Sequence, residues 1–303
     1  MIQTKQNFSK KSIAYFCLLV VCILWGTTWV ASSWTVRQGV SALQVAAFRQ
    51  LIGGALLCAG ILIYNKGKVK LPPLRDLILL AFLNFICSNG LSTWGVQYVP
   101  AGMASIIAAT YPLWMVVIYT IFFKRKITTK VWVGMIFALI GLIIVFFPVL
   151  KYSRYEENFL FGLWLTIVST ATWSLGTIYT KIQTEQDVDP YFSIGLQMLI
   201  SGIALTSFQK LSGHYTPIAD ITSHVWMGIF YLVIAGSIIS FSCFIYALKN
   251  LPAEQVSVYA YINPIVALIT SNIFMGEQIT NLLIIGGAIV LSGVYLINQA
   301  YKV

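Results

Sequence analysis

Hydrophobic residues occur along this chain in long runs, separated by short polar or basic segments. An α-helix needs about 20 mostly apolar residues to cross the hydrocarbon core of a bilayer, and each run approaches that length. We therefore predict an all-α polytopic membrane protein with ten transmembrane helices. Their ranges are 13–34, 43–64, 76–98, 101–123, 131–149, 159–181, 191–210, 225–248, 254–275 and 281–300.

The composition agrees with this pattern, because 58% of the residues are hydrophobic and only 9% are charged. A soluble domain carries about 25% charged residues. The lipid bilayer is therefore expected to be the main partner, and the net charge of +10 is interpreted as a topology signal rather than a nucleic-acid surface. The five cysteines form no CxxC pair, so no metal and no cofactor is expected.

The distribution of basic residues predicts the orientation in the membrane. With the N-terminus in the cytoplasm, fourteen of the 19 Lys and Arg residues fall in cytoplasmic segments and four on the opposite side, while Arg49 lies within a span. Because basic residues concentrate on the cytoplasmic side of membrane proteins, we predict that both termini are cytoplasmic.

The second part of the chain repeats the first. Residues 98–145 align without a gap on residues 250–297, so that "VPAGMAS" faces "LPAEQVS" and Pro112 faces Pro264. Upstream, "RQLIGG" faces "QMLISG". This predicts two domains of five helices each, residues 1–150 and 151–303. An odd number of spans per half gives the halves opposite orientations, and such inverted-topology repeats are typical of secondary transporters.

Several of these segments carry a family resemblance. The stretches "ILWGTTWVAS", "AAFRQLIGG", "VPAGMASIIAATYPLW", "ATWSLGTIYTK" and "LPAEQVSVYAYINPIVALITSNIFMGEQIT" resemble EamA-type transporters of the drug/metabolite transporter superfamily. The resemblance implies a ten-helix carrier of the bacterial inner membrane, built from two inverted halves. It implies transport of a small-molecule substrate such as an amino acid, another metabolite or a drug, and it does not identify that substrate.

Arg49 is the one basic residue placed well inside a predicted span, roughly 10 Å from the outer end at 1.5 Å per residue. A charged side chain at such a depth is costly and marks either a structural partner or a functional site. One interpretation is a scaffold arginine, with an ion pair to Glu277 at the outer end of span nine. The other is a clamp for a carboxylate or phosphate of the substrate.

Trp25 and Trp173 occupy equivalent places near the middle of spans one and six. Membrane tryptophans normally gather at the interfaces, so a pair at the midplane indicates either a cavity wall or helix packing. The prolines of spans four and nine, Pro112 and Pro264, each remove one helical hydrogen bond and predict kinks. Tyr111, Tyr259 and Asn263 beside these prolines are candidate substrate-binding residues.

Span three carries a polar stripe in which Asn84 and Ser88 share one helical face. Such a stripe faces protein or water rather than lipid, so it predicts either interhelical hydrogen bonds or a cavity lining. Thr28 in span one and Thr177 in span six complete the predicted substrate-binding set.

The sequence contains no HExxH, GxSxG or P-loop motif, which argues against an enzyme. We therefore expect a secondary carrier, most consistent with an exporter of an amino acid or a similar amphiphilic solute, that works by alternating access around a central cavity. A sugar-phosphate or nucleotide-sugar exchanger and a channel-like facilitator stay open as alternatives. The sequence leaves the coupling ion undetermined, and both a monomer and a homodimer are compatible with it.

Overall fold

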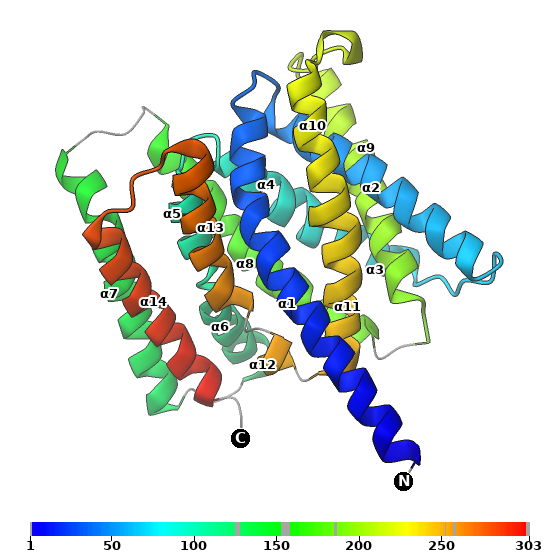
Figure 1. Cartoon of the computed structure of the whole chain (residues 1–303), viewed down its shortest axis with the longest axis horizontal. Coiled ribbons are helices and arrows are strands. Elements are labelled where there is room, and N and C mark those ends of the chain that lie inside the picture. Colours follow the sequence, from blue (N-terminus) through cyan, green and yellow to red (C-terminus); the bar gives the residue numbers. More distant parts are fainter. Residues whose placement is uncertain are drawn as a thin grey trace.

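A computed structural model describes the backbone of residues 2–124, 128–152, 158–184, 187–251, 253–256 and 259–300. Pro252 and residues 257–258 of the second repeated motif lie outside these segments. The described residues form helices joined by short loops (Figure 1). In chain order the elements are α1 (Ile2–Val36), α2 (Ala42–Tyr64), α3 (Leu74–Leu80), η1 (Ala81–Gly90), α4 (Leu91–Gly95), α5 (Ala101–Ala108), α6 (Tyr111–Phe123), α7 (Thr129–Tyr152), α8 (Phe159–Thr184), α9 (Pro190–Leu211), η2 (Ile218–Asp220), α10 (Ser223–Tyr231), η3 (Leu232–Ile239), α11 (Ser240–Asn250), α12 (Ala253–Val256), α13 (Tyr259–Met275) and α14 (Asn281–Ala300).

Seven helical segments of the described chain are long and apolar enough to cross a bilayer. They correspond to the predicted spans one to four and six to eight. Three shorter apolar helices, Thr129–Val145, Tyr259–Met275 and Asn281–Ile297, coincide with the predicted spans five, nine and ten. The chain is therefore an all-helical, multi-pass membrane protein, and α1 begins and α14 ends at the same end of the bundle (Figure 1).

Two of the long spans contain a π-helical segment. The span formed by α3, η1 and α4 is π-helical over Ala81–Gly90, and the span formed by α10, η3 and α11 is π-helical over Leu232–Ile239. These are the third spans of the two predicted halves. A π-helix has wider turns than an α-helix and occurs often at functional sites. Sequence periodicity did not reveal either segment.

Equivalent helices of the two predicted halves pack directly on each other, α2 on α9 and α7 on α14. A Cβ atom added to Gly134 would lie 2.6 Å from the carbonyl oxygen of Gly293, and one added to Gly141 would lie 2.6 Å from that of Gly286. In these contacts the residue numbers increase along α7 while they decrease along α14, so the two helices run antiparallel. The absence of side chains lets their backbones touch.

The α2–α9 contact has the same reciprocal form. A Cβ on Gly54 would lie 2.9 Å from the backbone nitrogen of Leu199, and a Cβ on Gly202 would lie 2.8 Å from that of Leu51. The two helices are thus antiparallel as well. The remaining large contacts also come in corresponding pairs: α1 packs on α13 and α11, while α8 packs on α5 and α6 and on η1 and α4.

The fourth span is broken at the predicted kink. Its two helices, α5 and α6, are separated by Ala109 and Thr110, and Pro112 lies in the first turn of α6. Proline suits that position because the first turn of a helix has no intrahelical partner for its N–H. Pro264 lies inside α13, where the predicted kink stays a prediction.

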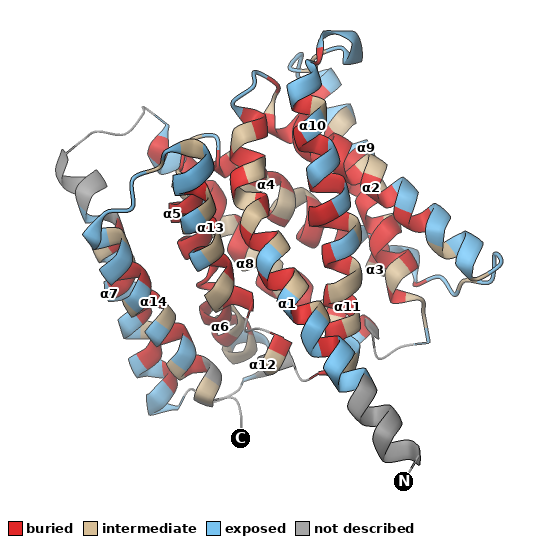
Figure 2. Ribbon diagram, in the orientation of Figure 1, coloured by how far each residue is buried: buried red, intermediate tan, exposed pale blue. Residues whose placement is uncertain are grey.

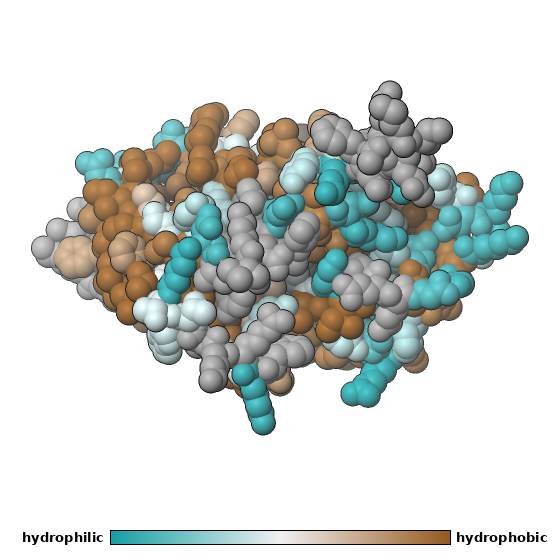
Figure 3. Space-filling model, turned by 90° about the horizontal axis from the view of Figure 1, so that it is seen from below, coloured by the Kyte–Doolittle hydropathy of each residue, from teal (hydrophilic) through white to brown (hydrophobic). Residues whose placement is uncertain are grey.

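Buried residues concentrate along the inward faces of the helices, and the outward faces are exposed (Figure 2). Many of the exposed side chains are large and apolar, such as Ile140 and Ile143 on α7 and Ile284 on α14. Seen from the end where α1 begins, hydrophobic residues occupy much of the margin and hydrophilic residues gather on the face itself (Figure 3). Lipid tails would cover such an apolar margin.

Candidate functional site

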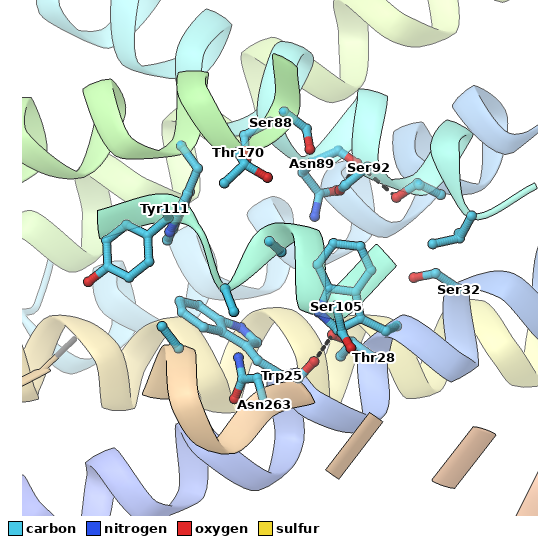
Figure 4. Close-up of a pocket in the computed structure, with 18 of the residues that line it drawn as sticks. Trp25, Thr28, Ser32, Ser88, Asn89, Ser92, Ser105, Tyr111, Thr170 and Asn263 are labelled. Carbon is cyan, nitrogen blue, oxygen red and sulfur yellow. Dashed lines mark hydrogen bonds between the residues drawn. The ribbon is translucent and has the colours of Figure 1, made fainter. Parts of the chain in front are cut away.

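A cavity of about 860 Å³, part of it continuous with open solvent, lies between helices of both predicted halves. Residues of α1, α2, η1, α4, α5 and α6 from the first predicted half, and of α8, α11 and α13 from the second, line it (Figure 4). Its lining consists of Trp25, Thr28, Trp29, Ser32, Arg49, Asn84, Ser88, Asn89, Ser92, Thr93, Val96, Ser105, Ala108, Ala109, Tyr111, Ser169, Thr170, Trp173, Phe241, Tyr259, Ala260 and Asn263.

One end of this cavity is closed by packed aromatic rings. The ring of Trp25 contacts those of Trp173, Phe241 and Tyr259 edge to face, with centroids 5.5, 5.3 and 5.3 Å apart. The ring of Tyr111 stacks on Tyr259 at 5.5 Å. The α1 side chains that precede Trp25 on the same face of the helix are buried in the hydrophobic core and do not line the cavity. The rings therefore form an aromatic floor, which we define as Trp25, Tyr111, Trp173, Phe241 and Tyr259.

The two midplane tryptophans have partners for their indole N–H groups. Nε1 of Trp25 donates to the carbonyl oxygen of Gly236 at 3.2 Å, and Nε1 of Trp173 donates to the hydroxyl of Tyr259 at 2.8 Å. Buried indoles generally need such a partner. Both rings also line the cavity, so the two interpretations of this pair, cavity wall and helix packing, describe different faces of the same residues.

Arg49 is buried, with 5% of its surface exposed, and its guanidinium reaches from α2 to η3. Its Nε donates to the hydroxyl of Ser237 at 2.9 Å, and its Nη2 donates to the carbonyl oxygen of Gly236 at 3.0 Å. Within the described residues no carboxylate pairs with it. A guanidinium has five N–H donors, so both donors of Nη1 and one of Nη2 are left for other acceptors.

The expected ion pair between Arg49 and Glu277 does not form, and this part of the prediction is wrong. The Glu277 carboxylate instead accepts hydrogen bonds from the backbone N–H groups of Ala101 at 2.9 Å and Gly102 at 3.2 Å. These are the first residues of α5, where N–H groups have no intrahelical partner and the helix dipole favours a negative charge. Glu277 therefore caps a helix of the other predicted half.

The polar stripe of the third span points partly into the cavity and partly into the protein. Ser88, Asn89 and Ser92 lie along the cavity (Figure 4). Asn84 lines it as well, and its Nδ2 donates to Thr180 at 3.2 Å and to Gln197 at 3.3 Å. Both sequence-level interpretations of this stripe, a cavity lining and interhelical hydrogen bonds, apply to different atoms.

Asn263 ties α13 to α1 beside the cavity. With its amide nitrogen turned toward the neighbouring carbonyls, it donates to Cys22 at 2.8 Å and to Tyr259 at 3.1 Å. The first of these bonds crosses between the predicted halves. The amide thereby helps to fix α1, whose face carries Trp25, Thr28 and Ser32 into the cavity.

The cavity brings together nine of the ten residues predicted to bind substrate. They are Trp25, Thr28, Arg49, Asn84, Ser88, Tyr111, Trp173, Tyr259 and Asn263. Whether these side chains contact a substrate stays a prediction. Thr177 is the exception and does not line the cavity. It is buried one turn beyond Trp173, where Gly176 allows Asn84 of η1 to approach α8 closely.

The lining also contains residues that the prediction omitted, among them Trp29, Ser32, Thr170 and Phe241. On α1 a signal was present in the sequence, because positions 25, 28, 29 and 32 share one helical face. Phe241 gave no comparable signal, since an aromatic residue in an apolar run is equally suited to lipid or to a core.

The side chains in the described lining of the cavity are neutral apart from one guanidinium. Among the described residues, no group of three or more His, Cys, Asp or Glu side chains lies close enough together to hold a metal ion. The five cysteines are free thiols. The lining offers hydroxyl and amide groups, aromatic faces and one guanidinium, which suits recognition of an amphiphilic solute.

Known proteins resemble this chain over most of its length. It is 28% identical to the uncharacterized inner membrane transporter YedA of Escherichia coli, over 88% of this chain and 84% of that protein. It is 26% identical to the uncharacterized transporter YvbV of Bacillus subtilis, over 94% of this chain and 91% of that protein. One solved crystal structure covers 96% of this chain and 99% of its own, with a TM-score of 0.69 at 15% identity, so it shares the fold.

The family match follows the two halves of the chain. The model of the EamA-like transporter family matches residues 12–147 and, a second time, residues 160–299. The two segments together include nearly all of the chain, and the cavity lies between them. This multi-pass membrane protein therefore belongs to the EamA-like transporter family.

Proposed function

We propose that this transporter is a secondary carrier that exports a small organic metabolite across the bacterial inner membrane by alternating access. The observation that carries the proposal is the cavity, which is lined from both family-matched segments. A site between two repeats, near the middle of the membrane, is the arrangement that alternating access uses, because the repeats can rock around it. Export is the direction that the family resemblance suggests.

The reciprocal helix contacts support two inverted repeats of five spans each. Equivalent helices, α2 with α9 and α7 with α14, meet antiparallel and through reciprocal glycine contacts. A two-fold axis in the membrane plane relates repeats in this manner. The three shorter apolar helices bring the number of apolar segments to ten, five within each family-matched range.

The cavity lining favours an amphiphilic solute of the size of an amino acid. The aromatic floor offers an apolar surface, and Thr28, Ser88 and Asn89 offer neutral hydrogen-bonding groups nearby. A sugar phosphate or nucleotide sugar carries at least two negative charges near neutral pH, and it would be matched by more than one basic residue. Among the described lining residues only Arg49 is basic, so these exchangers are the less favoured alternative.

Counterflow in proteoliposomes tests the carrier proposal. Vesicles are preloaded with an unlabelled amino acid, nucleoside or sugar phosphate, and the uptake of the same labelled compound is followed. A carrier accumulates label transiently above equilibrium, whereas a channel-like facilitator only equilibrates it. Protein-free vesicles provide the control. Equilibration without overshoot for every compound transported would contradict the carrier proposal and favour the facilitator.

A further inference from the structure

Among the described residues that line it, the cavity carries one positive charge and no negative charge to balance it. Arg49 is the only ionisable lining residue among the described residues apart from tyrosine hydroxyls. Its two hydrogen bonds go to a hydroxyl and a backbone carbonyl, which are neutral. Charged groups inside a membrane protein are usually paired or mark the path of a charged ligand. The missing counter-charge is therefore a property of the cavity that needs an explanation.

In the second half of the chain, a residue with a purely structural role occupies the position that corresponds to Arg49. Where the first half has Arg49, the repeat alignment puts Gln197 in the second. Gln197 on α9 accepts a hydrogen bond from Asn84 of η1, just as Arg49 on α2 binds Gly236 and Ser237 of η3. Both side chains thus connect a second span to a π-helical segment. Because a neutral amide makes this connection in one half, the connection itself does not require a charge.

The bonds to η3 hold the guanidinium in a fixed orientation at the edge of the aromatic floor. The carbonyl oxygen of Gly236 accepts from Nη2 of Arg49 at 3.0 Å and from Nε1 of Trp25 at 3.2 Å. One carbonyl oxygen therefore accepts hydrogen bonds from both the guanidinium and the indole. The donors of Nη1 and one donor of Nη2 have no described partner, and two parallel N–H groups on different guanidinium nitrogens fit the two oxygens of a carboxylate.

We propose that the cavity selects organic monoanions, in which a single carboxylate binds Arg49 and an adjoining apolar or aromatic group lies against Trp25. This inference rests on the proposed carrier function and refines its substrate class. A monoanion neutralises the cavity, whereas a zwitterion adds an ammonium group for which the described lining has no carboxylate. A cation would repel Arg49. The preferred order is therefore monoanion, then zwitterion or neutral compound, then cation.

Four compounds with the same phenyl group test this order. They are 3-phenylpropionate (anion), 3-phenylpropionamide (neutral), phenylalanine (zwitterion) and 3-phenylpropylamine (cation), and binding to the full-length protein in detergent is measured by calorimetry. We expect 3-phenylpropionate to bind at least tenfold more tightly than the other three. In Arg49→Gln this preference should disappear, while Arg37→Gln, which removes an exposed arginine, should retain it.

The outcomes separate this inference from the carrier proposal. Equal affinity for all four compounds, or binding of none, overturns the monoanion inference even when counterflow shows exchange of another solute. The preference in the wild-type protein needs no variant, so the test stands if Arg49→Gln does not fold. Loss of 3-phenylpropionate binding in 100 mM chloride, but not in 100 mM isethionate, would mean that Arg49 holds an inorganic anion and would also overturn it. Anion-selective binding without counterflow would support the inference and contradict the carrier.

Discussion

The indole rings of Trp25 and Trp173, from equivalent positions in the two halves, meet edge to face with their centroids 5.5 Å apart. Neither indole N–H serves the other ring, because Trp25 donates to Gly236 and Trp173 donates to Tyr259. Each tryptophan is thus anchored by the second half of the chain while one face stays open to the cavity. The floor depends on these anchors as much as on ring packing.

Replacing Tyr259 by Phe should weaken this floor. The hydroxyl that accepts from Trp173 is removed, and a polar group left without its partner costs about 1 kcal/mol or more. We expect a lower unfolding temperature in detergent, by a few degrees, and weaker binding of any ring-containing solute. Tyr64→Phe is the matched control, because that tyrosine is 84% exposed. Equal unfolding temperatures for the two variants would contradict the assignment.

Gly236→Ala should disturb Arg49 without removing it. A Cβ at this position would lie 2.7 Å from Cγ2 of Thr28 and 3.0 Å from Nη2 of Arg49, so both side chains would have to shift. We expect at least a tenfold loss of affinity for 3-phenylpropionate, measured by calorimetry. The control is Gly60→Ala on α2, where a Cβ meets no atom within 4 Å. Unchanged affinity in Gly236→Ala would show that the guanidinium is not held by η3.

The α7–α14 contact should be intolerant of any side chain at its glycines. In Gly141→Ala the new Cβ would lie 2.6 Å from both the Gly286 carbonyl oxygen and the Val290 nitrogen, and backbone atoms cannot move aside as a flexible side chain can. Overpacking of this kind costs about 1–3 kcal/mol. Thermal unfolding in detergent should therefore show a clear loss of stability, which Gly60→Ala should not. A Gly141→Ala protein as stable as the wild type would mean that α7 and α14 separate easily.

Glu277→Gln should loosen the start of α5. The amide retains one acceptor for the N–H groups of Ala101 and Gly102 but loses the negative charge that the helix N-terminus favours. We expect a loss of about 0.3–1 kcal/mol in unfolding free energy, the range typical of helix-end charges. Asp220→Asn, at the exposed end of the short helix η2, serves as the comparison. If both substitutions lower the unfolding free energy equally, the loss comes from a general change in surface charge and not from the end of α5.

The orientation in the membrane can be tested with reporter fusions. We expect a fluorescent reporter fused to the C-terminus to fold in the cytoplasm, and an alkaline phosphatase inserted in the loop 212–217 to be active outside it. The distribution of basic residues carries this expectation. The opposite pattern of activities would mean that the protein has the inverse orientation in the membrane. The proposed direction of export would then be reversed.

Much of the fold was legible in the sequence because bilayer thickness and apolar run length determine a span almost independently of tertiary contacts. The location of the cavity was also legible, since polar side chains such as Asn84 and Ser88 must avoid lipid. The π-helical segments were not, because a π-helical stretch needs the same apolar composition as the α-helical rest of a span. Gly236 in η3 and Asn84 in η1 each form a hydrogen bond with a second span of a predicted half.

The two errors at the site have different physical origins. Arg49 and Glu277 were paired because they carry opposite charges and both lie toward the predicted outer side, but each binds backbone groups: Arg49 binds a carbonyl oxygen, and Glu277 binds N–H groups at the start of α5. Thr177 was included in the predicted site as a polar residue of span six. Its polarity alone did not show that Thr177 lies outside the cavity lining.

The reciprocal glycine contacts of α2 with α9 and α7 with α14 make the chain comparable to an antiparallel homodimer whose two subunits have been joined covalently. In a dimer of identical subunits, every substitution appears twice and must be tolerated at both places. Once the halves share one chain, each can change alone. Small residues lie on both sides of the α2–α9 and α7–α14 contacts, while Arg49 and Gln197 differ at corresponding positions. A fused protein of this kind can thus place one charge, rather than two, beside its solute.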